Sequence, residues 1–397
     1  MTKMKDFAIS QLPMILFELG SIKKLASIAQ AYGDNVLIVT GDRSFCQGEY
    51  WSILTESLRR NHLNWEHCKV INEPSPYFIG DTVKHFAPQH IDVVVGIGGG
   101  SALDAAKAIA GLLKTQNSVF DYLEGVGPEL KYEGPAVPFI AVPTTAGTGS
   151  EATKNAVLSV QGEQGFKKSF RDERLVAKHA IIDANLLKSC PPSTIAANGM
   201  DALTQLLESY VSLKSNLFTD ALALSGLEAV RDSLLPWYHQ QFEVANECAQ
   251  MAYGALLSGI TLAQVGLGSV HGLASPLGAF FPIPHGVVCG SLVAVATRVN
   301  IESLLKRDSV SPILDKYARL GEVLSHQQFI SREQSWQALI ELLEQWVAEM
   351  KIPKLSTFGV KEADFTRIIA HSRGSSMQTN PIVLLDSEIG QILAERL

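Results

Sequence analysis

The sequence contains few cysteines, and their spacing indicates neither a disulfide framework nor a zinc ribbon. There are 5 cysteines in 397 residues, an odd number, far apart and without a CxxC pair. Small secreted domains depend on many paired cysteines, so this usage favours a reducing compartment. We expect a cytoplasmic protein.

The sequence also lacks an excess of basic residues and a leader-like N-terminus. Its 33 lysines and arginines are outnumbered by 40 aspartates and glutamates, which gives a net charge of −7. Because nucleic acids attract positive fields, a nucleic acid is not an expected partner. The N-terminal apolar stretch is short, is interrupted by Pro13 and has no small-residue cleavage site, so no signal peptide is predicted.

Charged residues are absent from one long segment. No Asp, Glu, Lys or Arg occurs in the 50 residues 248–297, although the chain as a whole is 18% charged. The part from Met251 to Val270 is long enough to cross a bilayer, but it contains Gln264 and several glycines and has no basic flanks. We therefore expect buried helices here and no membrane contact.

The length predicts two or three domains, since one domain usually takes about 150 residues. The first half alternates β-branched runs with amphipathic stretches, which is typical of a doubly wound parallel sheet. Expected strands are Val36–Thr40, His67–Ile71, Ile91–Gly96, Pro138–Val142 and Ala180–Asp183, with a hairpin over 153–170. Beyond residue 190 the pattern is helical. We predict an α/β domain over 1–188 and an all-helical domain over 189–397.

One predicted strand leads into the motif Gly98-Gly99-Gly100-Ser101 and then into a helix. Glycines let backbone N–H groups approach a phosphate, and a helix N-terminus favours negative charge. Ser101 is expected to cap the helix, with Asp104 three residues later as in a capping box. The motif predicts a dinucleotide pyrophosphate site; the alternative is a tight turn without a ligand.

A second loop, PTTAGTGSE at 143–151, also follows a predicted strand. Its Thr144, Thr145 and Thr148 offer hydroxyl groups at the carboxyl edge of the sheet, where open α/β folds bind ligands. With the glycine motif, this loop is expected to line one cofactor crevice.

A third group of candidates lies in the predicted helical domain. Asp201 and Gln205 are four residues apart and therefore share one helical face. His271 and His285 both lie in the segment without charge. An acid and two histidines in buried surroundings are candidate ligands for a divalent metal, although each histidine alone could be a core residue.

These motifs occur in the same order in a known family. The chain resembles the iron-containing (group III) alcohol dehydrogenases in GGGSALDAAK at 98–107, PTTAGTGSE at 143–151, Asp201, His271-Gly272 and Pro284-His285-Gly286. The resemblance implies a dehydroquinate synthase-like fold, in which an N-terminal α/β dinucleotide-binding domain and a C-terminal helical domain enclose the active site. It also implies hydride transfer between NAD(P)(H) and a primary alcohol or aldehyde, assisted by Fe²⁺ or, as a second choice, Zn²⁺.

Carried over position by position, the resemblance implies a role for each motif. The cofactor would be bound by Gly98, Gly99, Gly100, Ser101, Asp104, Thr144, Thr145, Thr148 and Lys167, with Lys168 as the neighbouring alternative to Lys167. The metal would be bound by Asp201, His271 and His285, with Gln205 as a candidate fourth ligand. His271, His285 and Ser275 would take part in catalysis.

Two positions depart from the family pattern. The family usually has a metal-binding histidine where this chain has Gln205, and an amide oxygen is a weaker ligand than imidazole. Many members also have a histidine where this chain has Ser275, which cannot buffer a proton near neutral pH.

Three alternatives stay open. A metal-independent reductase similar to maleylacetate reductases would tolerate Gln205. An oxidoreductase for an anionic sugar-acid or phosphonate aldehyde could use Lys168, Arg171 or Arg373. A nucleotide-binding protein without catalytic activity would explain both departures.

Cofactor choice depends on the loop after residue 40. Gly41 stands where NAD-preferring relatives carry an acid for the ribose 2′-hydroxyl, and Arg43 could attract a 2′-phosphate, which favours NADP. Asp42 could restore a preference for NAD. Because relatives are commonly dimers or larger, we expect a homo-oligomer that acts on a small-molecule alcohol or aldehyde.

Overall fold

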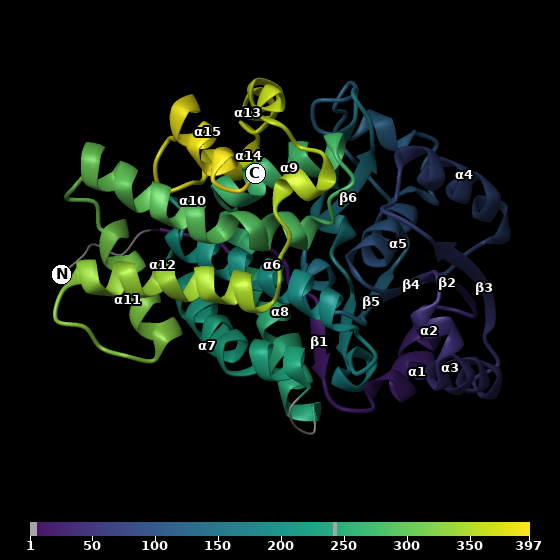
Figure 1. Ribbon diagram of the computed structural model, residues 1–397. Helices are drawn as coiled ribbons and strands as arrows, with labels where there is room; N and C mark the ends of the chain where they lie inside the picture. The colour runs from purple at the N-terminus through teal and green to yellow at the C-terminus, as the bar shows by residue number, and fades with distance from the viewer. Residues whose placement is uncertain (1–5, 241–243) are drawn as a thin grey trace. The chain divides into compact units, whose positions relative to one another are not determined.

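The computed structural model describes residues 6–240 and 244–397 (Figure 1). It divides into two compact units. The α/β unit comprises Ser10–Val160 and Gly165–Cys190; the helical unit comprises Pro191–Leu397 with residues 6–9 and Gln161–Gln164. The N-terminal segment for which no signal peptide is predicted begins with residues 1–5, which lie outside the described part.

The α/β unit contains a parallel sheet with the strand order β1-β8-β5-β4-β2-β3. Its strands are β1 (Met14–Phe17), β2 (Asn35–Gly41), β3 (Asn64–Val70), β4 (Val93–Gly98), β5 (Phe139–Pro143) and β8 (His179–Ile182). The five predicted strands are confirmed. The sequence analysis does not predict β1, because this four-residue strand lies at the sheet edge and leaves Met14 67% exposed.

Helices and a hairpin complete the α/β unit. The helices are α1 (Leu25–Gln30), α2 (Ser44–Gln47), α3 (Glu49–Arg60), α4 (Pro76–Phe86) and α5 (Gly100–Leu112), with short 3-10 turns between them. The predicted hairpin is confirmed as the antiparallel pair β6 (Asn155–Val160) and β7 (Phe166–Arg171). Every residue of β4 is buried, and α5 packs on the sheet through Leu103, Ala106 and Ile109. The end of β4 is therefore a rigid platform for the glycine motif.

The prediction that Ser101 caps α5 is wrong. The helix begins at Gly100 with Gly99 at the N-cap position, and Gly99 O already accepts hydrogen bonds from the backbone N–H groups of Ala102 and Leu103. The Asp104 carboxylate accepts from the Ser150 hydroxyl and from Val157 N instead of closing a capping box. Asp104 thus joins the start of α5 to residues 150–157.

A buried cation holds this junction together. Lys107 is fully buried, and its Nζ donates to Ser150 O, Ser150 Oγ, Thr153 Oγ1 and Asn155 O at 2.6–3.0 Å. The Asp104 carboxylate lies 3.6 Å from the same Nζ. Burial lowers the pKa of Lys107 and raises that of Asp104, and the attraction between the two groups opposes both shifts.

The neighbouring Glu151 gives a test of pH dependence. Burial raises its pKa to about 7, and Lys107 offsets this only in part. The folded protein therefore keeps a proton that the unfolded chain loses above about pH 4.5. Relative to Glu151→Gln, the wild type should lose about 1 kcal/mol of stability per pH unit as the pH rises from 5 to 7. Urea unfolding at several pH values measures this difference, and parallel curves for the two proteins would contradict it.

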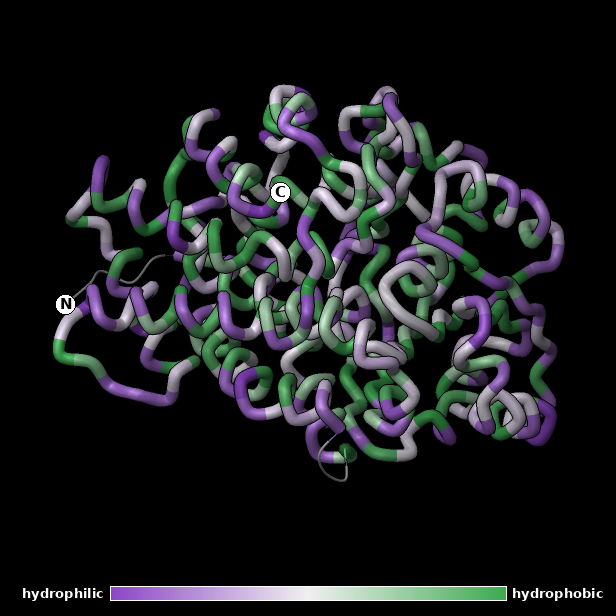
Figure 2. Tube along the Cα trace, in the orientation of Figure 1, coloured by the Kyte–Doolittle hydropathy of each residue, from purple (hydrophilic) through white to green (hydrophobic). Residues whose placement is uncertain are grey.

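The helical unit is formed by long helices and a C-terminal set of short ones. They are α6 (Pro192–Val211), α7 (Leu217–His239), α8 (Ala245–Val265), α9 (Ser269–Phe280), α10 (His285–Arg307), α11 (Ile313–Ser325), α12 (Arg332–Glu349), α13 (Phe365–His371), α14 (Ser375–Gln378) and α15 (Asp386–Ala394). Hydrophilic and hydrophobic positions alternate along α11 and α12 (Figure 2), as expected for helices with one face in the core.

The segment without charged residues forms α8 after its first three residues, all of α9 and the first half of α10. By length and composition α10 could cross a membrane, as could α8 and α9 together if their 99° bend counted as one span. In the structure, 83% of the apolar window of α10 is buried, and its side chains Val288, Leu292 and Val299 belong to a hydrophobic core. The predicted burial of this segment is confirmed.

Candidate functional site

Three helices of the helical unit bring the candidate ligands together. Asp201 and Gln205 lie on one buried face of α6, as their spacing predicts. His271 lies in the first turn of α9, and His285 is the first residue of α10, directly after Pro284. All four side chains reach one small region, although they are up to 84 residues apart in the sequence.

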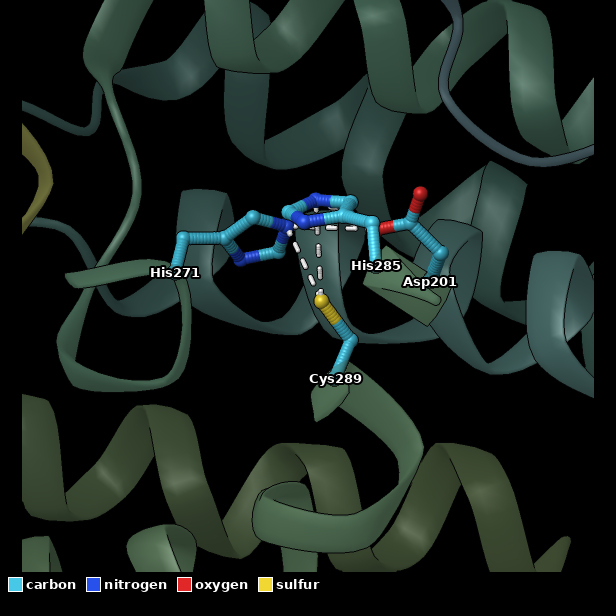
Figure 3. Close-up of side chains that lie close together, drawn as sticks. All are labelled: Asp201, His271, His285 and Cys289. Carbon is cyan, nitrogen blue, oxygen red and sulfur yellow. Dashed lines mark hydrogen bonds and ion pairs between the residues drawn. The ribbon is translucent and has the colours of Figure 1, made fainter. Parts of the chain in front are cut away.

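The ligand atoms of this cluster face one another (Figure 3). Asp201 Oδ1 lies 3.2 Å from His271 Nε2 and 3.7 Å from His285 Nε2. Besides Asp201, His271 and His285, the side chain of Cys289 points into the same space from the next turn of α10. One ligand atom from each of Asp201, His271, His285 and Cys289 lies within 4.8 Å of the others.

Glu208 fixes the orientation of His271. Its Oε2 lies 2.7 Å from His271 Nδ1, and its Oε1 accepts from Val270 N at 2.7 Å. A carboxylate only accepts, so Nδ1 donates a proton to Glu208, and Nε2 is the ring nitrogen that faces Asp201. Histidines that bind metals usually donate their other N–H to a carboxylate in this way.

Gln205 is held in place by its neighbours. Its Nε2 donates to Asp201 Oδ1 at 3.1 Å, and its Oε1 accepts from the Ser258 hydroxyl at 2.7 Å. In this orientation the amide N–H group, which cannot bind a metal, faces Asp201.

The electrostatics of the cluster favour a bound cation. Burial alone would raise the pKa of Asp201, but the His285 and His271 imidazoles hold it below its ordinary value. Burial would lower the pKa of His271, yet Cys289, Asp201 and Glu208 around it raise this pKa well above its ordinary value. Asp201 and Glu208 thus surround the imidazole of His271 with negative charge, which a proton or a bound cation can balance.

Two glycines of α10 let it approach α6 closely. A Cβ at Gly286 would lie 2.2 Å from Ala197 O, and one at Gly290 would lie 2.9 Å from Met200 Cβ. Any larger residue would separate the two helices at the level of Asp201 and His285.

Replacement of Glu208 gives a test of the cluster as a metal site. Glu208→Gln keeps the shape and an oxygen acceptor but removes the charge that supports His271. We expect Zn²⁺ affinity to fall about 10–100-fold, with little change in melting temperature. Competition titration with a chromophoric chelator measures the affinity, and Glu228→Gln, an exposed position on α7, is the control. Equal affinities in all three proteins would contradict a role for Glu208 in metal binding.

In the α/β unit the two predicted cofactor loops meet. Thr144 N donates to Gly98 O at 3.0 Å. A Cβ at Gly99 would lie 3.2 Å from Thr145 Oγ1, and one at Gly100 would lie 2.7 Å from the Thr148 side chain. Gly98 approaches Gly41 N as well, at 3.3 Å from its missing Cβ. Only glycines fit this junction at the carboxyl ends of β2, β4 and β5.

Other predicted site residues have protein partners. Lys167 Nζ forms an ion pair with Glu73 at 2.6 Å, and Asp42 pairs with Arg43 at 2.9 Å. Ser101 lies in the first turn of α5, and Ser275 lies one turn after His271 on α9. Of the candidates for an anionic substrate, Arg171 pairs with Glu124 and Arg373 with Asp386.

Cys289 is the member of the cluster that the sequence analysis does not predict. A signal for it was present, because Cys289 follows His285 by four residues and so lies on the same face of α10. Disulfide pairing and CxxC spacing, the two cysteine patterns considered in the sequence, do not reveal a single cysteine that lies beside a histidine.

Comparisons with known proteins identify the class. Residues 13–184 match the family model described as "Iron-containing alcohol dehydrogenase", and residues 195–397 match "Fe-containing alcohol dehydrogenase family, C-terminal". The chain therefore belongs to the iron-containing alcohol dehydrogenase family, whose members are oxidoreductases.

Individual relatives extend over most of the chain. It is 34% identical to alcohol dehydrogenase 4 of Saccharomyces cerevisiae, over 81% of this chain and 80% of the relative. It is 32% identical to long-chain-alcohol dehydrogenase 1 of Geobacillus thermodenitrificans, over 94% and 92%. Among solved structures, a 1,3-propanediol oxidoreductase matches with a TM-score of 0.88 and 26% identity, covering 99% of this chain and 100% of that one.

Proposed function

We propose that the protein transfers hydride between NAD(P)(H) and a primary alcohol or aldehyde with the help of a divalent metal. The observation that carries this proposal is the convergence of Asp201, His271 and His285 in the helical unit. The glycine motif that meets the threonine loop in the α/β unit supports a dinucleotide site.

The residues present fit a divalent cation. A buried carboxylate and two imidazoles offer lone pairs toward a common space, and a proton on His271 Nδ1 leaves Nε2 available. Asp201, His271 and His285 would bind the ion; Gln205, the fourth candidate from the family pattern, directs its amide N–H group at Asp201. When bound, the metal supplies Lewis-acid polarisation of a carbonyl oxygen, while the nicotinamide supplies or accepts the hydride.

The chain's own residues would prepare the site for this chemistry. Asp201 supplies negative charge, Glu208 holds His271 through Nδ1, and Asp201 and His271 are buried. In buried surroundings each of these electrostatic interactions is stronger than in water. Ser275, one turn from His271, could pass a proton along a hydroxyl or water chain.

Cofactor binding would use the two meeting loops. Gly98, Gly99, Gly100 and Ser101 would receive the pyrophosphate at the N-terminus of α5, beside Thr144, Thr145 and Thr148. Asp104 would hold the start of α5 against Ser150. Lys167, on β7, would contact the cofactor as the family pattern implies. Gly41 and the Asp42–Arg43 pair lie at the end of β2 and favour NADP, since Arg43 partly neutralises Asp42.

The substrate is proposed to be a neutral primary alcohol or aldehyde. Relatives are named for long-chain alcohols, lactaldehyde and 1,3-propanediol, all small molecules with a hydroxyl or carbonyl group. The pairing of Arg171 and Arg373 with acidic side chains favours a neutral over an anionic substrate.

Five cysteines without disulfide bonds support a reducing, cytoplasmic location.

The deciding experiment is aldehyde-dependent oxidation of NADPH and NADH by purified protein. It is run with and without a strong chelator, and with Fe²⁺ or Zn²⁺ added back. We expect turnover that is lost with chelator and restored by metal. Turnover indifferent to chelator would replace the proposal with a metal-independent reductase, and nucleotide binding without any turnover would indicate a non-catalytic protein.

A further inference from the structure

We infer that the Cys289 thiolate is a metal ligand in this protein and that the resulting centre selects Zn²⁺ over Fe²⁺. The inference rests on the proposed function, because it concerns the same metal site. It differs from the family pattern in the nature of the ligands: one sulfur, two nitrogens and one oxygen instead of nitrogen and oxygen alone.

The first argument is the position of the sulfur. Cys289 is completely buried, and its Sγ lies 3.6 Å from His271 Nε2 and 3.8 Å from His285 Nε2. Figure 3 shows the thiol directed at both imidazoles. A cysteine that only fills space in a core has no need of two imidazole nitrogens beside its sulfur.

The second argument is the size of the cluster. In a tetrahedral zinc site, bond lengths of about 2.0–2.1 Å to nitrogen and 2.3 Å to sulfur place these two ligand atoms about 3.6 Å apart. Nitrogen and carboxylate oxygen ligands are then about 3.3–3.4 Å apart by the same geometry. The separations in the cluster are 3.6 and 3.8 Å for sulfur to nitrogen and 3.2 and 3.7 Å for oxygen to nitrogen. These four of the six separations in the cluster are therefore close to those of a tetrahedral ligand set, and the other two are below 4.8 Å.

The third argument is the state of Gln205. Its Oε1, the one atom of the side chain able to bind a metal, accepts from Ser258 Oγ. Its Nε2 donates to Asp201 Oδ1, which supports a ligand instead of supplying one. Gln205, at the position of the histidine in the family pattern, thus donates to Asp201 and is not part of the cluster of ligand atoms, whereas Cys289 on α10 is.

Metal choice follows from ligand type. Thiolates favour Zn²⁺, whereas a site of imidazole and carboxylate alone accepts Fe²⁺ readily. Binding releases the thiol proton of Cys289 to solvent, since the thiolate is the ligand form. Four protein ligands also fill a tetrahedral centre, so a substrate oxygen would enter as a fifth ligand.

The test is spectroscopic. Metal-stripped wild type, Cys289→Ser, Cys289→Ala and Gln205→Ala are titrated with Co²⁺ without oxygen. Cys248→Ser, a fully buried cysteine on α8 outside the cluster, is the matched control. We expect a near-ultraviolet thiolate-to-cobalt charge-transfer band in wild type, Gln205→Ala and Cys248→Ser, and no such band in either Cys289 variant. Zn²⁺ affinity should fall more than about 100-fold in Cys289→Ala, beyond the usual effect of losing a supporting residue.

The outcomes separate this inference from the proposed function. Cobalt bound to the wild type without the charge-transfer band would overturn the Cys289 assignment and leave the metal site intact. A band that persists in Cys289→Ser, which conserves the packing, would overturn it as well. Absence of cobalt binding in the wild type would overturn the metal-assisted function together with this inference.

Discussion

Replacing His271 by alanine is expected to lower the kcat of aldehyde reduction by about 10³-fold. The reason is that a metal contributes several kcal/mol of transition-state stabilisation, and loss of one of its buried ligands removes most of it. Nucleotide binding should persist, because the glycine and threonine loops belong to the α/β unit. Steady-state kinetics measures the first effect, and NADPH fluorescence titration measures the second.

A matched control is available for this variant. His239 lies at the end of α7, forms a 2.8 Å contact with Glu349 and is about one-third exposed. Because surface pairs contribute little, His239→Ala should keep both activity and metal content. Full activity in His271→Ala, or equal loss in both variants, would remove the basis for the metal assignment.

Replacing Lys107 by methionine is expected to destabilise the protein by about 3–5 kcal/mol. Methionine fills a similar volume, but Asp104 and Glu151 lose their buried counter-charge, and Ser150 O and Asn155 O lose a donor. Without Lys107, the pKa values of both carboxyl groups would rise further. The loop after β5 should loosen first, so the KM for NADPH should rise as well.

Urea unfolding measures this effect, with Lys114→Met as the control. Lys114 is exposed just beyond the end of α5, and its replacement should change stability by less than about 0.5 kcal/mol. A midpoint for Lys107→Met equal to that of the wild type would show that the buried network is not needed for stability.

The sequence predicts the architecture well where patterns are local. The strands at the centre of the sheet are continuous apolar runs, so β2, β4 and β5 can be recognised from composition. The start of α5 could not be placed from capping rules, because Gly99 and Gly100 adopt the N-terminal turn without a polar cap. The edge strand β1 could not be found either, since its side chains are mostly exposed.

The candidate metal site could be predicted only through residue types and a family pattern. Asp201, His271 and His285 are recognisable, but nothing in the sequence places Glu208 behind His271 or turns Gln205 toward Ser258. Those contacts join residues 53 and 63 positions apart, and only the packing of α6 against α8 and α9 creates them. Cys289 can be predicted to lie beside His285 once α10 is recognised as a helix that starts at His285.

The close approach of α10 to α6 at Gly286 and Gly290 sets the distance between the backbones that carry the candidate ligands, whatever the side chains at those positions. Asp201 and His285 lie on backbones held at a fixed separation. Exchanging one candidate ligand would therefore change the chemistry of the site but not the distance between the two helices. A larger ion that prefers six ligands would need the two helices to lie farther apart. Gly286 and Gly290, which pack directly against Ala197 and Met200, keep them close. Engineering this site for another metal would therefore have to start with the two glycines and not with the ligands.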